Sequence, residues 1–269
     1  MRDDHKTGWH WAQIPLARCC LPCRSVPTYL RWAFLFFILL LGGLLRWAYY
    51  INMDRAPIDE SRYLSTIHEW LLSGKMPDTY LSLPFYPYCM VHISKATGIA
   101  PEIVSHWGAL ICGLLLLWLI YVVTQKLFSH NLVALMSVGI AAVAPYLVRH
   151  GMVVLREQFY WPMFMLMMML ALIVLAEQCY SRRYCLIGAM SIIAAVGFLT
   201  RIEGIELLLL GVVGVWMSKV HYRQRMVETM LFVVLFAGLW LGGIRLTTGL
   251  WFPHNYWSKI YQLDKMTEI

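Results

Sequence analysis

Long apolar segments, separated by short charged connections, constrain this chain more than any other feature of its sequence. A membrane span needs about 20 mostly apolar residues, or somewhat fewer where neighbouring helices shelter it. Only 14% of the residues are charged, against about 25% in a soluble domain. The sequence therefore predicts an all-α, polytopic membrane protein with about seven spans, at residues 32–51, 104–124, 132–148, 158–176, 185–200, 204–218 and 227–246.

The predicted spans divide the chain into three parts. Residues 1–31 form an N-terminal segment, 32–246 the transmembrane module and 247–269 a C-terminal segment. The connection 52–103 after the first span is too long to be a turn. The N-terminal segment is not expected to be a cleavable signal peptide, because it is long and polar and no small-residue cleavage site follows the first apolar run.

The placement of Lys and Arg predicts a cytoplasmic N-terminus. Basic residues precede the first span and recur in alternate connections, at Arg2, Lys6, Arg18, Arg24, Arg31, Lys126, Arg182, Arg183, Lys219, Arg223 and Arg225. The bias is modest, because the opposite connections are basic as well. The net charge of +7 is explained by cytoplasmic anchoring and by anionic lipid headgroups. It does not indicate nucleic-acid binding, because no run of Lys and Arg is dense enough to form such a face.

Three connections on the predicted outer side combine arginines with carboxylates. They carry Asp54, Asp59, Glu60 and Arg62, then Arg149, His150, Arg156 and Glu157, then Arg201, Glu203 and Glu206. Ionisable groups near a membrane boundary usually face the protein interior or a wet cavity. The cluster is typical of a site that opens outward, or of ordinary interfacial anchors and salt bridges, and charge placement alone leaves both interpretations open.

The first outer connection begins with a predicted amphipathic helix. Leu64, Ile67, Leu71 and Leu72 follow helical spacing and Gly74 is a plausible stop, which indicates a helix lying in the membrane interface. Asp59 then stands at the helix N-terminus, where it would cap the helix or would be held ionised for chemistry. The segment 88–98 predicts a second short interfacial helix.

The cysteines before the first span, Cys19, Cys20 and Cys23, leave three interpretations open. They are inert thiols, sites of juxtamembrane lipidation, or part of a metal site with His5 and His10. Their spacing matches no standard zinc pattern. Cys112, Cys179 and Cys185 fall in or beside apolar segments and are expected to be small core residues.

Several short segments occur in a familiar order. "DESRY" opens the first outer connection, "LPFYP" follows, Arg156-Glu157 enters a span, and "LTRIEG" and "FPHNYWSK" come later. Together they resemble the GT-C superfamily of membrane glycosyltransferases, near glycosyltransferase family 39, which includes protein O-mannosyltransferases and aminoarabinose transferases. Two departures stand out, Ile202 where proline is common and His254 before Asn255. The resemblance covers roughly residues 30–260.

The resemblance implies a multi-span helical module with interfacial helices in its first outer loop. It implies inverting transfer of a sugar from a polyprenyl-phosphate donor, at the outer face of a bacterial inner membrane. Asp59 would be the general base and Glu60 its support. Arginines suit the leaving phosphate because the planar guanidinium forms paired hydrogen bonds. The candidates are Arg156, Arg201 and Arg149, in that order, with Glu157, Glu203, Arg62 and Tyr63 in supporting positions.

Some questions stay open at the level of sequence. Arg201 would alternatively form a structural pair with Glu203 or Glu206. No metal constellation is evident, although some members of the superfamily need a divalent cation and an Asp-Glu pair could bind one. Relatives usually have more spans, so the chain is expected to be a fragment, a truncated product or a compact relative, and the acceptor is not defined. A transporter or flippase-like protein and a catalytically inactive scaffold of the same fold are the alternative functions.

Overall fold

The computed structural model describes residues 27–53, 58–77 and 84–249, and every regular element within these ranges is helical. This confirms the all-α prediction for the described part of the chain. The cysteines at positions 19, 20 and 23 and the segment "FPHNYWSK" lie outside the described residues. The helices are α1 (Thr28–Ile51), α2 (Ile58–Ser73), α3 (Phe85–Thr97), α4 (Pro101–Phe128), α5 (Asn131–Val143), α6 (Pro145–His150), α7 (Arg156–Ala176), α8 (Tyr180–Thr200), the 3₁₀ turn η1 (Ile202–Gly204), α9 (Ile205–Trp216) and α10 (Tyr222–Thr248).

Five of these helices are long and apolar enough to cross a membrane, namely α1, α4, α7, α8 and α10. Their length and composition are those of membrane-spanning helices, as the sequence predicted for a membrane-embedded chain. The two other predicted spans fall on α5 with α6 and on α9, which have 13, 6 and 12 residues. Each of these helices is shorter than the roughly 20 residues that a straight span requires. The count of seven spans therefore stays a prediction.

Proline and glycine set several helix boundaries. Pro101 and Pro145 occupy the first turns of α4 and α6, where the missing N–H costs no intrahelical bond. α5 ends just before Pro145, which breaks the third predicted span. Gly74, Gly98 and Gly249 follow α2, α3 and α10 with φ between 69° and 73°, a left-handed conformation that glycine adopts without steric penalty. Gly74 was predicted to stop α2, and this prediction is confirmed.

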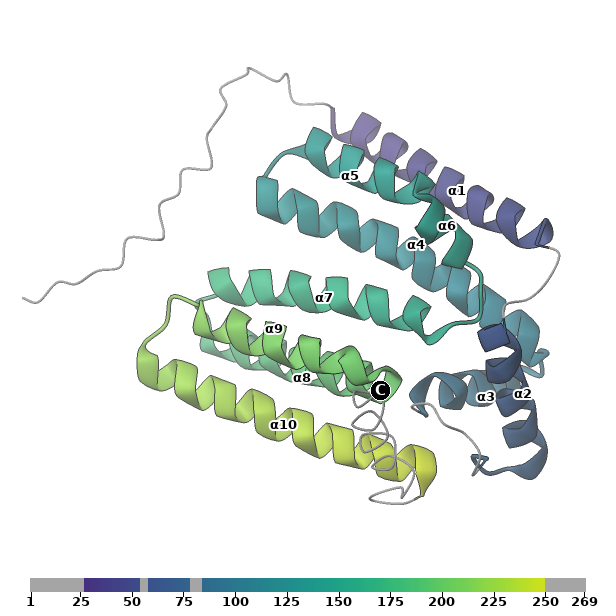
Figure 1. The fold of residues 1–269 in the computed structure, drawn as a ribbon. Coiled ribbons are helices and arrows are strands. Elements are labelled where there is room, and N and C mark those ends of the chain that lie inside the picture. The colour runs from purple at the N-terminus through teal and green to yellow at the C-terminus, as the bar shows by residue number, and fades with distance from the viewer. Residues whose placement is uncertain (1–26, 54–57, 78–83, 250–269) are drawn as a thin grey trace, which may run out of the picture.

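The long helices run back and forth, so their connections gather at two ends of the molecule (Figure 1). One end holds α2, α3 and the residues that join α6 to α7 and α8 to α9. We call it the α2 end. The opposite end holds the connections α4–α5, α7–α8 and α9–α10. The three connections that were predicted to share one side of the membrane therefore do lie at one end of the bundle.

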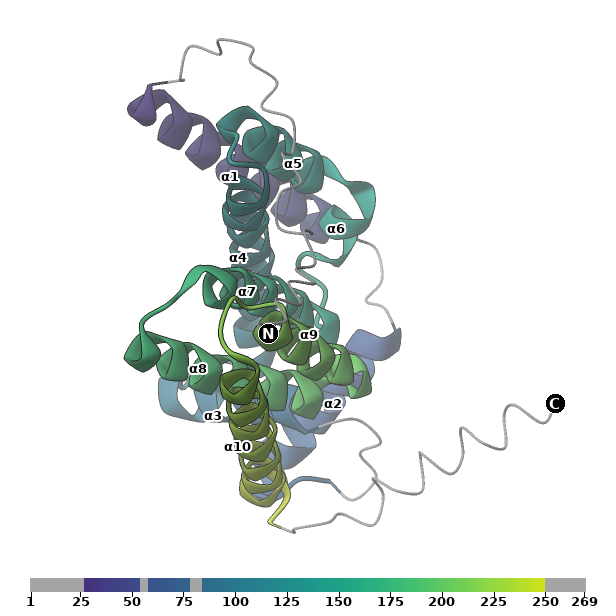
Figure 2. The ribbon, with the colours of Figure 1, turned by 90° about the vertical axis from the view of Figure 1, so that its left-hand side faces the viewer.

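Three apolar cores hold the helices together. One joins α7, α8, α9 and α10, and a second joins α1, α4 and α5. α4 packs on α7 and links the two groups, as Figure 2 shows with α4 and α7 between α1 and α5 above and α10 below. The third core fixes α2 and α3 to the start of α4 and to residues 154–159. α2 and α3 are therefore packed parts of the fold.

A buried arginine stabilises the break between α5 and α6. Arg46 on α1 is 1% exposed, and its Nη1 donates to the carbonyls of Gly42 at 2.8 Å and Ala142 at 3.4 Å. Ala142 lies in the last turn of α5, where carbonyls lose their helical partners and a cation is favourable. Gly113 and Gly151 leave room for the side chain, since a Cβ at Gly151 would lie 2.4 Å from Arg46 Cδ. Arg46 thus links α1 to α5 by hydrogen bonds and packs against α4 at Gly113.

Candidate functional site

The helix α2 carries the candidate base and is docked on the bundle by one buried face. Glu60, Tyr63, Ile67 and Trp70 are buried and recur every three or four residues. The tyrosine packs edge-on against Tyr86 of α3, with ring centroids 5.6 Å apart. The sequence correctly predicted the helix but not its buried face, which does not include Leu72, 89% exposed. Helical spacing alone did not separate the side that meets α3 and α4 from the side that faces outward.

The adjacent carboxylates of α2 lie in opposite environments. The Asp59 side chain is 68% exposed, and its Oδ1 lies 3.7 Å from Nη1 of Arg62. The Glu60 side chain is 3% exposed and faces His106 of α4. Asp59 is the second residue of α2, so it lies within the first turn and is not the cap residue. Its charge still favours the positive end of the helix dipole. Asp59 is thus accessible to a substrate, whereas Glu60 is not.

A second charged group joins the start of α7 to the connection between α8 and α9. Arg201 donates from Nε and Nη2 to the two carboxylate oxygens of Glu203, at 3.0 and 2.7 Å. Its Nη1 lies 3.2 Å from Oε1 of Glu157. The carboxylate of Glu157 is also 3.7 Å from Nε of Arg156. The hydrogen bonds from Arg201 hold the pKa of Glu203 far below its usual range, at about 2. We call these four residues the arginine–glutamate network.

Tyr160 of α7 extends this network to Glu206 of α9. Its hydroxyl donates to the Glu203 carbonyl at 3.0 Å and to Oε2 of Glu206 at 3.2 Å. The guanidinium carbon of Arg201 lies 5.6 Å from the ring centroid, within the range of a cation–π contact. The structural pairing of Arg201 that the sequence left open is therefore present with Glu203 and not with Glu206. Arg201 is therefore held in place by Glu203, by Glu157 and by the ring of Tyr160.

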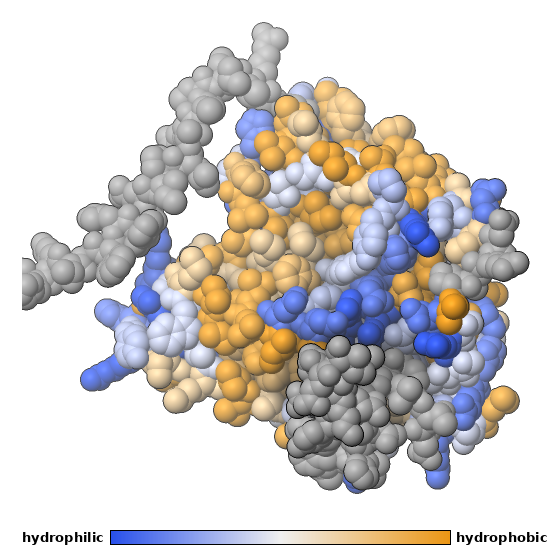
Figure 3. Space-filling view, in the orientation of Figure 1, coloured by the Kyte–Doolittle hydropathy of each residue, from blue (hydrophilic) through white to orange (hydrophobic). Residues whose placement is uncertain are grey.

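Arg149 and Arg156 are less constrained than Arg201. Arg149 is an exposed residue in the last turn of α6, and within the described part of the chain it takes part in no ion pair. Arg156 begins α7, and its side chain is 29% exposed. A band of hydrophilic side chains crosses the middle of the face in Figure 3 toward the α2 end, between apolar surfaces. Of the three arginines predicted to bind the leaving phosphate, these two have fewer ion-pair partners than Arg201 among the described residues.

The backbone at "TRIEG" explains its glycine. A Cβ at Gly204 would lie 2.4 Å from the backbone N of Phe198 and 2.5 Å from the carbonyl carbon of Gly197. Side chains cannot be accommodated at such distances, because backbone atoms cannot turn away. Only glycine therefore lets η1 fold back against the end of α8, and this fold places Arg201 beside Glu157.

The described residues do not combine into an evident metal site. Asp59 and Glu60 diverge, so they do not offer their oxygens to one shared cation. Within the ranges that the structure describes, no group of three or more His, Cys, Asp or Glu side chains is arranged to hold a metal ion.

The structure thus brings the predicted site residues other than Arg149 into two groups at the α2 end. Asp59, Glu60, Arg62 and Tyr63 lie on α2, and Arg156, Glu157, Arg201 and Glu203 form the network. Among the described residues no ion pair connects the two groups. Sequence reasoning missed His106, because a lone histidine inside an apolar segment carries no motif. It also missed Tyr160, whose helical position opposite Glu206 depends on packing between α7 and α9.

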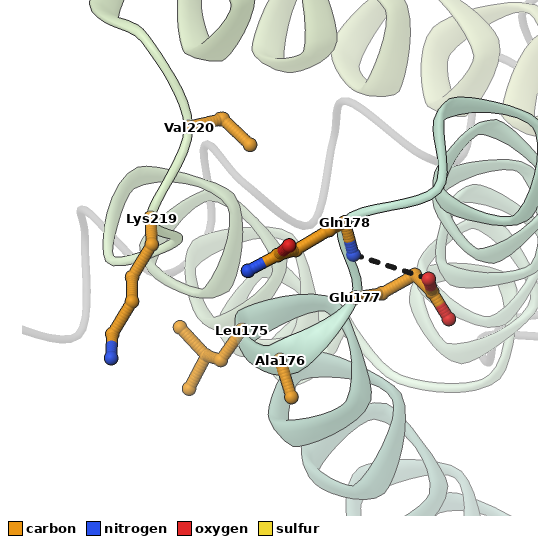
Figure 4. A pocket seen from close by; sticks show the side chains of 6 residues that line it. All are labelled: Leu175, Ala176, Glu177, Gln178, Lys219 and Val220. Carbon is orange, nitrogen blue, oxygen red and sulfur yellow. Dashed lines mark hydrogen bonds between the residues drawn. The ribbon is translucent and has the colours of Figure 1, made fainter.

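A small pocket lies at the other end of the bundle. It is lined by Leu175, Ala176, Glu177, Gln178, Lys219 and Val220 (Figure 4). Glu177 Oε1 accepts the backbone N–H of Gln178 at 3.1 Å, so this carboxylate caps its own turn. The pocket shares no residue with the groups at the α2 end.

Comparisons with known proteins give no independent assignment: no family model, curated protein or solved structure matches the chain.

Proposed function

We propose that this chain transfers a sugar from a polyprenyl-phosphate-linked donor to an acceptor at the outer face of the membrane, with inversion at the anomeric carbon. The observation that carries the proposal is the position of Asp59. It is an exposed carboxylate on a helix docked beside the membrane bundle, at the end that also holds the arginine–glutamate network. The order of the sequence motifs, which resembles that of GT-C glycosyltransferases, supports the same reaction.

In this proposal Asp59 is the general base. The acceptor hydroxyl oxygen attacks the anomeric carbon, and its proton passes to the Asp59 carboxylate. The bond between the anomeric carbon and the phosphate oxygen breaks, and the electron pair leaves with the lipid phosphate. The developing positive charge at the sugar ring is stabilised by a nearby carboxylate, as in glycoside hydrolysis. The first turn of α2 suits this role, because the Asp59 side chain there is accessible, at 68% exposed.

The leaving phosphate needs a cation that is free to bind it. We assign this contact first to Arg149 and Arg156, since Arg201 already donates to Glu203 and lies beside Glu157. Arg201 then organises the network and keeps Glu157 beside Arg156. Guanidinium groups bind phosphate through paired, charge-assisted hydrogen bonds, so either arginine would stabilise the charge that the leaving group gains.

The test uses the whole chain in lipid nanodiscs with a panel of polyprenyl-phosphate sugars. Conversion of one donor to free polyprenyl phosphate, with the sugar recovered on an acceptor, supports the proposal. In proteoliposomes, movement of an intact donor between leaflets without its consumption would instead identify a flippase-like protein. No consumption and no movement with any donor in the panel would leave the inactive scaffold as the better account.

A further inference from the structure

A buried acid–histidine pair fastens α2 to the membrane bundle. Oε1 of Glu60 lies 3.4 Å from Nε2 of His106, and the two side chains are 3% and 11% exposed. Oε2 of Glu60 accepts the backbone N–H of Val154 at 3.4 Å. The ring of Tyr50 lies over the histidine, with centroids 4.4 Å apart. The pair therefore joins α2, α4 and the segment before α7 at a largely buried site.

The other ring nitrogen of His106 fixes where its proton must be. Nδ1 lies 2.8 Å from the carbonyl oxygen of Met152. A carbonyl only accepts, so Nδ1 carries a hydrogen and donates it. A neutral ring has a single N–H, and Nε2 is then a bare acceptor. Nε2 can donate to Glu60 only when the ring is positively charged.

The number of protons on the pair therefore decides whether the two groups bind each other. With no proton to share, the carboxylate and Nε2 are both acceptors and repel. With two protons, the imidazolium can still donate to the carbonyl oxygen of the neutral acid, but the charge assistance of the bond is lost. With one proton, either Glu60 donates to Nε2 or Nε2 donates to the carboxylate, and both arrangements form a hydrogen bond. We propose that Glu60 and His106 hold one proton between them, and that this proton fastens α2 to α4.

The surroundings favour this single-proton state. Burial raises the pKa of Glu60, against the opposing effects of His106 and of the Val154 N–H. The titratable groups that face the pair are Tyr50 from α1, Tyr63 within α2, Tyr86 from α3 and Glu102 from α4. Glu102 is bound by His68 at 2.5 Å.

The pair also has a consequence for the candidate base. Asp59 adjoins Glu60 in the first turn of α2, so in this proposal the contact with His106 helps to fix how that turn sits on the bundle. This makes His106 a positioning residue for sugar transfer, a consequence that rests on the proposed function. The docking of α2 does not rest on the proposed function, because it is a property of the fold and can be measured without any sugar donor.

Hydrogen–deuterium exchange of the α2 peptide tests the inference on the whole chain in nanodiscs. Rates are measured from mildly acidic to alkaline pH and divided by those of the unstructured peptide at the same pH. We expect protection of α2 in the wild-type chain to fall about tenfold or more as the pH rises and the shared proton is lost, the size of one lost charge-assisted hydrogen bond, and to change less on the acid side. Constant protection across the range would overturn the inference.

The variant Glu60→Gln makes the test specific. A glutamine amide donates to a bare Nε2 and its oxygen accepts from a protonated one, so Gln at this position bonds to either form of His106. Protection of α2 in Glu60→Gln should therefore be nearly independent of pH. A His92→Gln control removes an exposed histidine of α3 and should keep the wild-type profile. If Glu60→Gln keeps the wild-type profile as well, the shared proton is not what fastens α2, whatever the outcome of the transfer assay.

Discussion

Replacing Arg183 by methionine should destabilise the bundle far more than the same change at its neighbour Arg182. Arg183 and Glu228 form a salt bridge in which both side chains are 0% exposed. Nε and Nη2 of the arginine donate to the two carboxylate oxygens at 3.0 and 2.5 Å. The same guanidinium donates to the carbonyls of Val174 and Glu177, at 2.8 and 2.9 Å.

The size of the effect follows from what each variant leaves behind. Removal of one partner from a buried pair leaves an uncompensated charge and costs about 3–5 kcal/mol. Arg183→Met or Glu228→Leu should therefore lower the unfolding temperature by about 6–20 °C. The double variant buries no charge, so its loss should be well below the sum of the two single losses, as expected of directly coupled residues. Arg182 is exposed, and Arg182→Met should change stability by less than about 0.5 kcal/mol.

Thermal unfolding of the purified chain in one detergent, followed by helical circular dichroism, measures all four variants against the wild type. Equal unfolding temperatures for Arg183→Met and Arg182→Met would refute the reasoning, because they would mean that Arg183 is solvated. Additive losses in the double variant would refute the direct pairing with Glu228.

Two further perturbations probe the α2 end. Gly204→Ala forces a Cβ against backbone atoms and should lower the free energy of unfolding by about 1–3 kcal/mol. Gly188→Ala places its Cβ where no atom lies within 4 Å, so it should be neutral or slightly stabilising. Equal unfolding temperatures for the two variants would contradict the packing of η1. Arg201 lowers the pKa of Glu203 from 4.5 to about 2, so the stabilisation that this carboxylate provides is complete above its ordinary pKa and is lost as the pH falls toward 2. Glu203→Gln should remove the fall in unfolding temperature that protonation of Glu203 causes at acid pH. If the unfolding temperature of the variant still falls at acid pH as in the wild type, the bond between Glu203 and Arg201 does not persist in solution.

The sequence was sufficient to predict what depends on periodicity and on strong local signals. Five of the predicted spans have matching long helices, α2 ends at Ser73 just before Gly74, and the three charged connections predicted to share one side lie at one end. These features follow from apolar length, from glycine conformation and from the alternation of helices. They do not require knowledge of which helix packs on which.

What depends on packing could not be predicted in this way. Arg183 was counted among the basic residues of the predicted cytoplasmic connections, but it lies within α8, is enclosed by α7, α8 and α10 and pairs with a glutamate 45 positions away. Glu60 and Asp59 are adjacent in sequence but differ almost completely in exposure. His106 became relevant only once α4 was seen beside α2. Each of these depends on a contact distant in sequence, which no local pattern encodes.

The rate of sugar transfer by Asp59→Asn tests the central claim most directly. Asparagine keeps the shape of the side chain but cannot accept the acceptor's proton, and loss of a general base lowers rates by about 10²–10⁴-fold. The matched control is Glu69→Gln, which removes another exposed carboxylate of α2. With a donor that the wild-type chain consumes, the account predicts that Asp59→Asn loses at least about a hundredfold in rate while Glu69→Gln transfers at the wild-type rate. Equal rates for Asp59→Asn and the wild type would contradict it.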